Sequence, residues 1–203
     1  MKALQRSDSL RQALVARVLA LIAALAAGAA AANSDELLAT LLSDIAKHSH
    51  ERARFDEETY SRVLKHPLHA TGELYFDAPD RLEKKILTPA AEDLLVEGET
   101  VTIMRGTRRH SFQLGDYPSL RPLLEGLRAT LAGDLAGLTA RFSIMAEQHG
   151  EDWLITLQPL PSEIQPLYQR IEIRGREGRV RSVQIEREQG ERSLMTIDAA
   201  VPP

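Results

Sequence analysis

The sequence of 203 residues contains no cysteine. No disulfide can therefore stabilise the fold, so the chain must be held together by its hydrophobic core, for which about 170 residues suffice. The absence also excludes the lipidated cysteine that anchors bacterial lipoproteins to a membrane. We expect a single domain that diffuses freely.

Long apolar runs are also missing. The longest, residues 18–27, is too short for a permanent transmembrane helix, which needs about 20 residues. Small residues follow it as far as position 32, and basic residues precede it, at Lys2, Arg6, Arg11 and Arg17. This layout is typical of a secretory signal peptide. We predict a signal peptide at residues 1–32, cleaved before Asn33, and one periplasmic domain at residues 33–203; the alternative is an uncleaved N-terminal anchor.

Basic residues are too few for a general nucleic-acid binder. Lysine and arginine number 25 against 29 aspartates and glutamates, a net charge of −4, and residues 33–203 alone carry 21 basic and 28 acidic residues. Such a domain presents little positive charge to phosphates, so we predict no nucleic-acid partner. The negative charge suits a protein that works among lipids without adhering to anionic headgroups.

Recognisable catalytic motifs are absent as well. The sequence has no Gly-x-Ser-x-Gly elbow, no zinc-protease helix motif and no phosphate-binding loop. The acidic neighbours Glu57-Glu58 and Glu92-Asp93 lie on predicted strands or turns, where adjacent side chains diverge and cannot form an acid/base pair. We predict a protein that is not an enzyme, with no catalytic residues and no cofactor.

Histidines occur in two close groups, His48 with His50 and His66 with His69. By residue type they could be metal ligands. They lie at the end of a predicted helix and beside a proline, where histidines are commonly solvated, so we predict no metal site.

Period-two alternation of apolar and charged residues is plentiful. Leu74 and Phe76 alternate with polar neighbours, as do Leu82 and Ile86 one strand later. Such alternation predicts an antiparallel sheet with one apolar and one wet face. The expected strands are at residues 72–77, 81–87, 93–97, 100–105, 108–114, 140–148, 152–158, 167–174, 179–188 and 192–198.

Two segments have the helical period instead. Residues 34–48 carry a stripe of leucine and isoleucine, and residues 118–138 carry seven leucines at intervals of three and four. Gly126, Gly133 and Gly137 interrupt the second segment, each at a cost of about 1 kcal/mol in a helix interior. These glycines suit a movable cover; the alternative is an ordinary packed helical hairpin with glycines where backbones come close.

Aromatic residues make up only 4% of the chain. Many apolar strand faces covered by two helical stripes of leucine and isoleucine predict an enclosed cavity. An apolar cavity binds apolar ligands, and each acyl CH₂ withdrawn from water contributes about 0.8 kcal/mol. The alternative is a fully packed core without a ligand.

Arginines gather on two predicted hairpins, at residues 105–109 and 174–181. Such a basic rim could contact a phosphorylated headgroup or an acidic partner protein. The alternative is a solvated strand face balanced by nearby glutamates.

Several short motifs follow one another in a characteristic order: Arg54-Phe55, residues 72–76 (GELYF), Pro79, Pro89, residues 94–98 (LLVEG), residues 152–157 (DWLITL) and residues 171–180 (IEIRGREGRV). Their order and spacing resemble those of the LolA-like family of periplasmic outer-membrane lipoprotein carriers. The resemblance extends over residues 35–200.

The resemblance implies an α+β fold in which an incomplete antiparallel β-barrel of about ten to eleven strands is closed by a lid of α-helices. It implies a monomeric carrier of lipid or lipoprotein acyl chains, with an inner-membrane ABC-type or other lipid exporter as donor and an outer-membrane receptor as acceptor. The implied cavity residues are Leu74, Phe76, Leu82, Ile86, Phe112, Trp153 and Ile155. The implied lid residues are Leu37, Leu41, Ile45, Leu123, Leu124, Leu127 and Leu131.

Two positions depart from the family pattern. Ala78 stands where the family commonly has an arginine that hydrogen-bonds to the lid, and Arg81 lies on a different step of the strand. Lys84 stands where the family tends to have an aromatic residue. These changes indicate a divergent member whose cargo can differ from a triacylated lipoprotein. The alternatives are a carrier of a glycolipid or polyene-type ester, a periplasmic lipid-sensing regulatory domain and, more remotely, a lipid hydrolase.

Overall fold

A computed structural model describes residues 34–48, 50–160, 168–187 and 190–198. The chain divides into two compact units, residues 1–37 and residues 38–203. The predicted signal peptide lies outside the described residues. Among the helices of the described part, none is long and apolar enough to cross a membrane.

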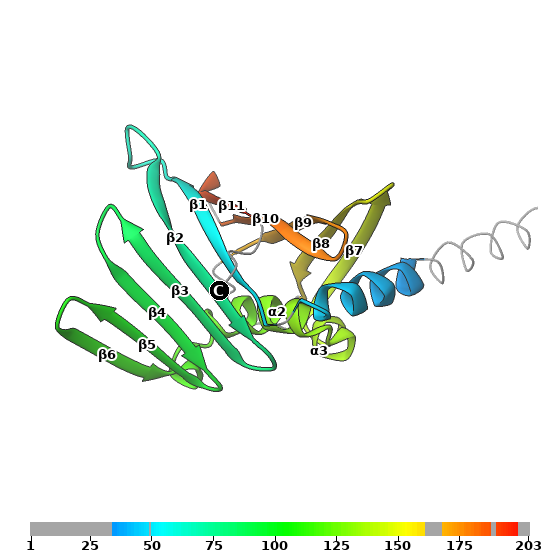
Figure 1. The fold of residues 1–203 in the computed structure, drawn as a ribbon, viewed down its shortest axis with the longest axis horizontal. Helices are drawn as coiled ribbons and strands as arrows, with labels where there is room; N and C mark the ends of the chain where they lie inside the picture. Colours follow the sequence, from blue (N-terminus) through cyan, green and yellow to red (C-terminus); the bar gives the residue numbers. More distant parts are fainter. Residues whose placement is uncertain (1–33, 49, 161–167, 188–189, 199–203) are drawn as a thin grey trace, which may run out of the picture. The chain divides into compact units, whose positions relative to one another are not determined.

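The second unit is built on one antiparallel sheet of eleven strands (Figure 1). The strand order is β6-β5-β4-β3-β2-β1-β11-β10-β9-β8-β7, so the first and last strands pair in the middle. The edge strands β6 and β7 do not pair, which leaves the sheet open. The bounds are β1 (Arg52–Tyr60), β2 (Leu68–Asp77), β3 (Arg81–Thr88), β4 (Glu92–Glu97), β5 (Thr100–Arg105), β6 (Arg108–Gln113), β7 (Phe142–His149), β8 (Asp152–Pro159), β9 (Arg170–Arg176), β10 (Arg179–Glu186) and β11 (Arg192–Ile197).

Alternation along each strand agrees with the pairing between strands. Leu74 of β2 lies opposite Ala53 of β1 and Lys84 of β3, and Phe76 lies opposite Leu82. Directly opposed residues share a face, so the apolar side chains of neighbouring strands gather on one side of the sheet. The predicted α+β fold, with ten to eleven antiparallel strands and a helical cover, is confirmed.

The leucine-rich segment 118–138 forms two helices, α2 (Arg121–Ala132) and α3 (Leu135–Thr139), after a short 3₁₀ turn η1 (Leu114–Asp116). α2 ends at Gly133, whose φ of 75° is the left-handed conformation that glycine adopts without strain. α3 begins at Asp134, whose carboxylate accepts a hydrogen bond from the Gly137 amide at 2.9 Å. Two of the three glycines therefore act at helix ends.

Gly126 has a different role, inside α2. A methyl group at this position would lie 2.7 Å from Cζ of the Phe142 ring, so α2 approaches the start of β7 where a side chain is missing. This close approach joins a helix to a strand rather than two helices, and it packs α2 against the sheet. In Figure 1, α2 and α3 lie between strands β2–β6 and strands β7–β9.

Residues 34–46 form the N-terminal helix, of which residues 38–46 belong to the second unit. A methyl group at Gly133, the end of α2, would lie 3.0 Å from Cβ of Ala46. One at Gly178, in the β9–β10 turn, would lie 2.8 Å from the carbonyl oxygen of Asp44. Residues 38–46 therefore touch both α2 and the sheet, and the two helical segments form one cover.

The apolar face of the sheet is filled with side chains in two places. A cluster near β4–β6 consists of Val96, Val101, Leu114 and Leu124. On β8 and β9 the buried residues are Trp153, Ile155, Leu157, Ile171 and Ile173. On the strands between these two regions, β1–β3, β10 and β11, the apolar face is not filled with side chains to the same extent.

Candidate binding cavity

A cavity of about 370 Å³ lies between the sheet and its helical cover. The apolar strand residues in its wall are Ala53, Leu74, Phe76, Leu82, Leu94, Ile173, Val180, Val183, Ile185, Met195 and Ile197. The cover contributes Ile45, Leu120, Leu123, Leu124, Leu127 and Leu131. Ligand pockets in proteins typically measure about 300–1,000 Å³ and have mostly apolar walls with a few polar groups. This cavity has the size and lining of such a site.

The structure brings together eight of the residues that the family resemblance assigned to cavity and lid. Leu74, Phe76 and Leu82 lie in the wall formed by β2 and β3. Above them lie the lid residues Ile45, Leu123, Leu124, Leu127 and Leu131. Leu124 also belongs to the buried cluster near β4–β6, so it has a structural role as well.

Four of the assigned cavity residues lie elsewhere. Ile86 is two residues beyond Lys84 on β3, opposite Gly72 and Glu92, and does not reach the cavity. Phe112, on the edge strand β6, packs against the cluster near β4–β6. Trp153 and Ile155 are buried in the filled region of β8, where Ile155 is 0% exposed. In that region the packed-core alternative is correct.

Two of the assigned lid residues also lie outside the cavity. Leu41 is buried, but the cavity wall does not include it. Leu37 belongs to the first unit, whereas every residue of the cavity wall belongs to the second. Of the apolar stripe at residues 38–46, Ile45 is the member that contributes to the wall.

Sequence reasoning missed the contribution of β10 and β11. Val183 and Ile185 alternate with polar residues, as do Met195 and Ile197, and this pattern predicts an apolar face. It does not say which strands are neighbours. β11 pairs with β1, from which it is far away in the sequence, and this pairing brings β11 and β10 onto the same sheet as β2, on the other side of β1.

Charged pairs occur at two places in the cavity wall, and Arg181, Arg187 and Asp198 also line it. Nζ of Lys84 lies 2.6 Å from Oε2 of Glu57. At the second place, Glu51 accepts from Arg179 at 2.6 Å and contacts Nδ1 of His48 at 2.7 Å. These groups make the wall amphipathic.

Tyr75 lines the cavity and also forms a hydrogen bond with a charged residue that does not line it, Glu73. Its hydroxyl donates to Glu73 at 2.7 Å, and this hydrogen bond raises the pKa of Tyr75 above its ordinary value. Hydrogen bonds from Arg52 and Tyr75 lower the pKa of Glu73. The three groups therefore hold the carboxylate ionised and the tyrosine protonated.

The cover is attached to the sheet by arginines of α2. Arg128 donates to the carbonyl oxygen of Gly98 at 2.9 Å and lies 3.9 Å from Asp80. Arg121 pairs with Glu99 in the β4–β5 turn. Asp80 follows directly on Pro79, so the turn that carries Ala78 is contacted by an arginine from the helix.

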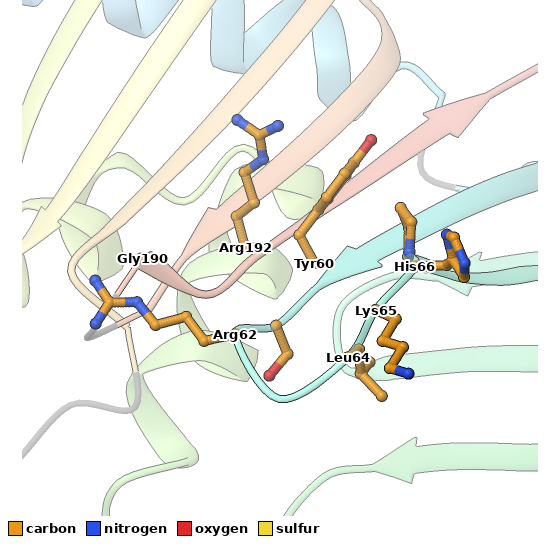
Figure 2. A pocket seen from close by; sticks show the side chains of 9 residues that line it. Tyr60, Arg62, Leu64, Lys65, His66, Gly190 and Arg192 are labelled. Atoms are coloured by element: carbon orange, nitrogen blue, oxygen red, sulfur yellow. The ribbon is translucent and has the colours of Figure 1, made fainter.

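A second hollow, of about 360 Å³, lies at the β1–β2 loop and the start of β11 (Figure 2). Its side chains are mainly polar and include Arg62, Lys65, His66 and Arg192. The guanidinium of Arg192 lies 4.5 Å from the centre of the Tyr60 ring. Of these two hollows, the first has the apolar wall expected of an acyl-chain site.

Several of the histidines and arginines singled out in the sequence have acidic partners. His50 contacts Asp77 at 2.5 Å and His69 lies 3.6 Å from Glu58. Within the described ranges no group of three or more histidine, cysteine or acidic residues could hold a metal ion. On the predicted basic rim, Arg176 binds Asp152 and Arg174 binds Glu172, each at 2.6 Å, so acidic residues balance these charges.

An open antiparallel sheet with an apolar cavity beneath helices places this chain among proteins whose fold can enclose an apolar ligand. The chain belongs to the LolA_3 family, described as outer membrane lipoprotein carrier protein LolA-like, whose sequence profile matches residues 26–201. No curated protein matches the chain.

Three solved structures are similar to this chain at low identity. A LolA superfamily protein from Nitrosomonas europaea has a TM-score of 0.49 at 11% identity, covering 84% of this chain and 94% of that one. An outer membrane lipoprotein-sorting protein domain from Vibrio parahaemolyticus has a TM-score of 0.47 at 7% identity, with 83% and 91% covered. Lipoprotein LppX from Mycobacterium tuberculosis has a TM-score of 0.39 at 9% identity, with 81% and 96% covered.

Proposed function

We propose that this protein is a periplasmic carrier that binds the acyl chains of lipoproteins or related lipids and transfers them from the inner membrane toward the outer membrane. The observation that carries the proposal is the cavity of about 370 Å³ with its apolar wall. Membership in the LolA-like family supports it. The donor would be an inner-membrane lipid exporter of the ABC or another type, and the acceptor an outer-membrane receptor.

The energetics of such a cavity suit reversible binding. Each CH₂ group moved from water into the cavity contributes about 0.8 kcal/mol, so eight of them contribute roughly 6 kcal/mol before the entropic cost of binding. No covalent step is needed, and we propose that the protein is not an enzyme. Uptake and release would instead require the cover of α2 and residues 38–46 to move.

Native mass spectrometry with lipid extraction is the direct test of this proposal. The protein is purified from periplasm without detergent, and the mass of any retained ligand is measured. An acylated species bound in a one-to-one ratio is the expected result, and it would identify the cargo class. Protein that is empty and also fails to bind a fluorescent fatty acyl probe would overturn the proposal and favour a regulatory domain without a lipid ligand.

Changing one residue of the cover tests whether the cavity is the binding site. Leu127 lines the cavity and does not belong to the buried cluster near β4–β6, whereas Leu124 belongs to both. A carboxylate at position 127 would have to be desolvated when an acyl chain binds, at a cost of several kcal/mol. We therefore expect Leu127→Glu to weaken binding of a fluorescent acyl probe at least about tenfold.

The matched control for this variant is Ala136→Glu. Ala136 is an exposed residue of α3 that does not line the cavity, so this variant adds the same charge without touching the wall. Probe affinity should remain unchanged in Ala136→Glu, and both variants should keep the circular-dichroism spectrum of the sheet. Equal affinity of both variants would place the binding site outside this cavity.

A further inference from the structure

The cavity wall contains a charged pair among its apolar residues. Lys84 and Glu57 have side chains only 18% and 16% exposed, and both line the cavity together with Leu74, Leu82 and Leu94. Their 2.6 Å contact is a direct hydrogen bond from the ammonium to the carboxylate. Such a pair is unexpected in a wall that only has to be apolar.

The fold builds this pair from two strands that are not neighbours. Lys84 is on β3 and Glu57 is on β1, and β2 lies between them. The strand between them carries Gly72, opposite Phe55. A methyl group at Gly72 would lie only 2.8 Å from the Phe55 ring, and the ammonium of Lys84 lies 5.0 Å from the centre of that ring. The missing side chain lets the Phe55 ring and the Lys85 carbonyl oxygen lie close to β2 at Gly72, and the ammonium of Lys84 lies over that ring.

The pair gains the protein little stability by itself. Desolvation of two charges commonly offsets their attraction, and apolar residues of similar volume in their place are often as stable or more stable. Covering the pair with a hydrocarbon chain would also remove the water that still reaches it. A ligand that is apolar along its whole length is therefore disfavoured at this point of the wall.

A suitable ligand must offer hydrogen bonds there. An ammonium has three N–H donors and a carboxylate about four acceptor sites, and the contact between the two uses one of each. The pair therefore presents donors beside acceptors. A neutral group that both accepts and donates, such as an amide or hydroxyl, satisfies both partners. An ester accepts only, and a carboxylate is attracted by Lys84 but repelled by Glu57.

We propose that Lys84 and Glu57 form a polar subsite that recognises an amide or hydroxyl group carried by an apolar chain. This inference rests on the proposed function, because it assumes that an acyl chain enters the cavity. It makes the pair a specificity determinant that favours amide-linked or hydroxylated chains over ester-linked chains and free fatty acids.

Three ligands with the same chain length test this subsite. Dodecanamide, methyl dodecanoate and dodecanoate each compete against a fluorescent fatty acyl probe bound to the full-length protein. We expect dodecanamide to bind at least about tenfold more tightly than methyl dodecanoate, because hydrogen bonds to charged groups are among the strong ones. Equal affinities for amide and ester would overturn the inference and leave the proposed function intact. Absence of binding by all three and by the probe itself would overturn both.

Two variants distinguish recognition from a merely structural role. In Lys84→Met with Glu57→Leu, both charges are replaced by apolar side chains, so the protein should stay folded and the preference for the amide should disappear. In Glu57→Gln the repelling carboxylate is gone, and dodecanoate should gain affinity at least about fivefold relative to dodecanamide. An unchanged order of the three ligands in either variant would contradict the subsite.

An ion pair outside the cavity provides the matched control. Arg176 and Asp152 are 2.6 Å apart on β9 and β8, are about half exposed and do not line the cavity. Arg176→Met with Asp152→Leu should keep the ligand preference of the unmodified protein. Thermal unfolding of all variants shows whether a change in preference comes from the subsite or from a loss of structure.

Discussion

Many charged side chains on the wet face of the sheet form ion pairs. Asp93 of β4 is the informative exception among the described residues. Burial raises the pKa of Asp93, and the negative charge of Glu83 raises it further. Its Oδ1 is buried without a hydrogen-bond partner among the described residues. The folded protein therefore disfavours the ionised form of this carboxyl group.

Asp93→Asn should stabilise the protein at neutral pH. Because the folded pKa lies above the ordinary value of 3.8, the stability associated with protonated Asp93 is complete below that value and is lost as the pH rises through the folded pKa. At pH 7 the asparagine avoids this loss, so the variant should have the higher Tm. The difference should vanish near pH 3, where aspartate is protonated too.

Thermal unfolding at both pH values checks this expectation, with Asp56→Asn as the control. Asp56 is exposed on β1, so replacing it should change the Tm little. A lower Tm for Asp93→Asn at neutral pH would show that the carboxylate makes a favourable interaction with solvent or with another group.

Among the elements, α2 supplies most of the helical residues that line the cavity. Four of its leucines lie over the cavity, while Gly126 holds it against Phe142 and arginines attach it to the turns of the sheet. Of these attachments, Arg128 is the most enclosed, with a side chain only 15% exposed. It contacts Gly98 and Asp80, in the two turns that flank β3 and β4.

Arg128→Ala should therefore speed ligand exchange. The lost hydrogen bond from a charged group corresponds to about 1.5 kcal/mol, which would raise the population of the detached cover roughly tenfold. The dissociation rate of a fluorescent acyl probe, measured by stopped flow, should rise by a similar factor. Arg108→Ala is the control, because Arg108 is exposed on the edge strand β6. Equal rates in both variants would mean that α2 does not open to release the ligand.

Considered as a whole, the molecule has a filled part and a hollow part on one sheet. The apolar side chains of β8 and Ile171 of β9 are buried against their neighbours, whereas side chains of β1–β3, β10 and β11, together with Leu94 and Ile173, border the cavity. In such a protein, the strands of the filled part provide most of the stability, and the strands of the hollow part provide the binding site. Large changes in one part should leave the property of the other part nearly unaltered.

Two alanine substitutions measure this division. Ile155→Ala creates a cavity in the filled part and should lower the free energy of unfolding by about 2–5 kcal/mol, with probe affinity nearly unchanged in the remaining folded protein. Val183→Ala removes two methyl groups from the cavity wall and should cost about 1 kcal/mol or less. That variant should instead bind the probe several-fold more weakly. A result with the two effects exchanged would contradict the assignment of filled and hollow parts.

Local patterns in the sequence were sufficient to identify most of the elements, although β1 (Arg52–Tyr60) is not among the strands expected from alternation. Period-two alternation marked the strands because each successive side chain points to the opposite face, and leucine spacing marked the cover at residues 118–138. A glycine also indicated the break between α2 and α3, since Gly133 adopts the left-handed conformation. These properties depend only on residues close together in the chain.

The tertiary structure alone decided which apolar faces surround space and which are filled. Trp153 and Ile155 have the same alternating pattern as Val183 and Ile185, yet the first two are buried and the last two line the cavity. The difference comes from the order of the strands, which depends on the pairing of β1 with β11. The contact between Lys84 and Glu57 also depends on the tertiary structure, because it crosses a strand at Gly72 and joins residues 27 positions apart. The sequence by itself determined that this protein would be an amphipathic sheet with a leucine-rich cover, whereas the place of the cavity and its charged pair followed from contacts between distant segments, which no local pattern specifies.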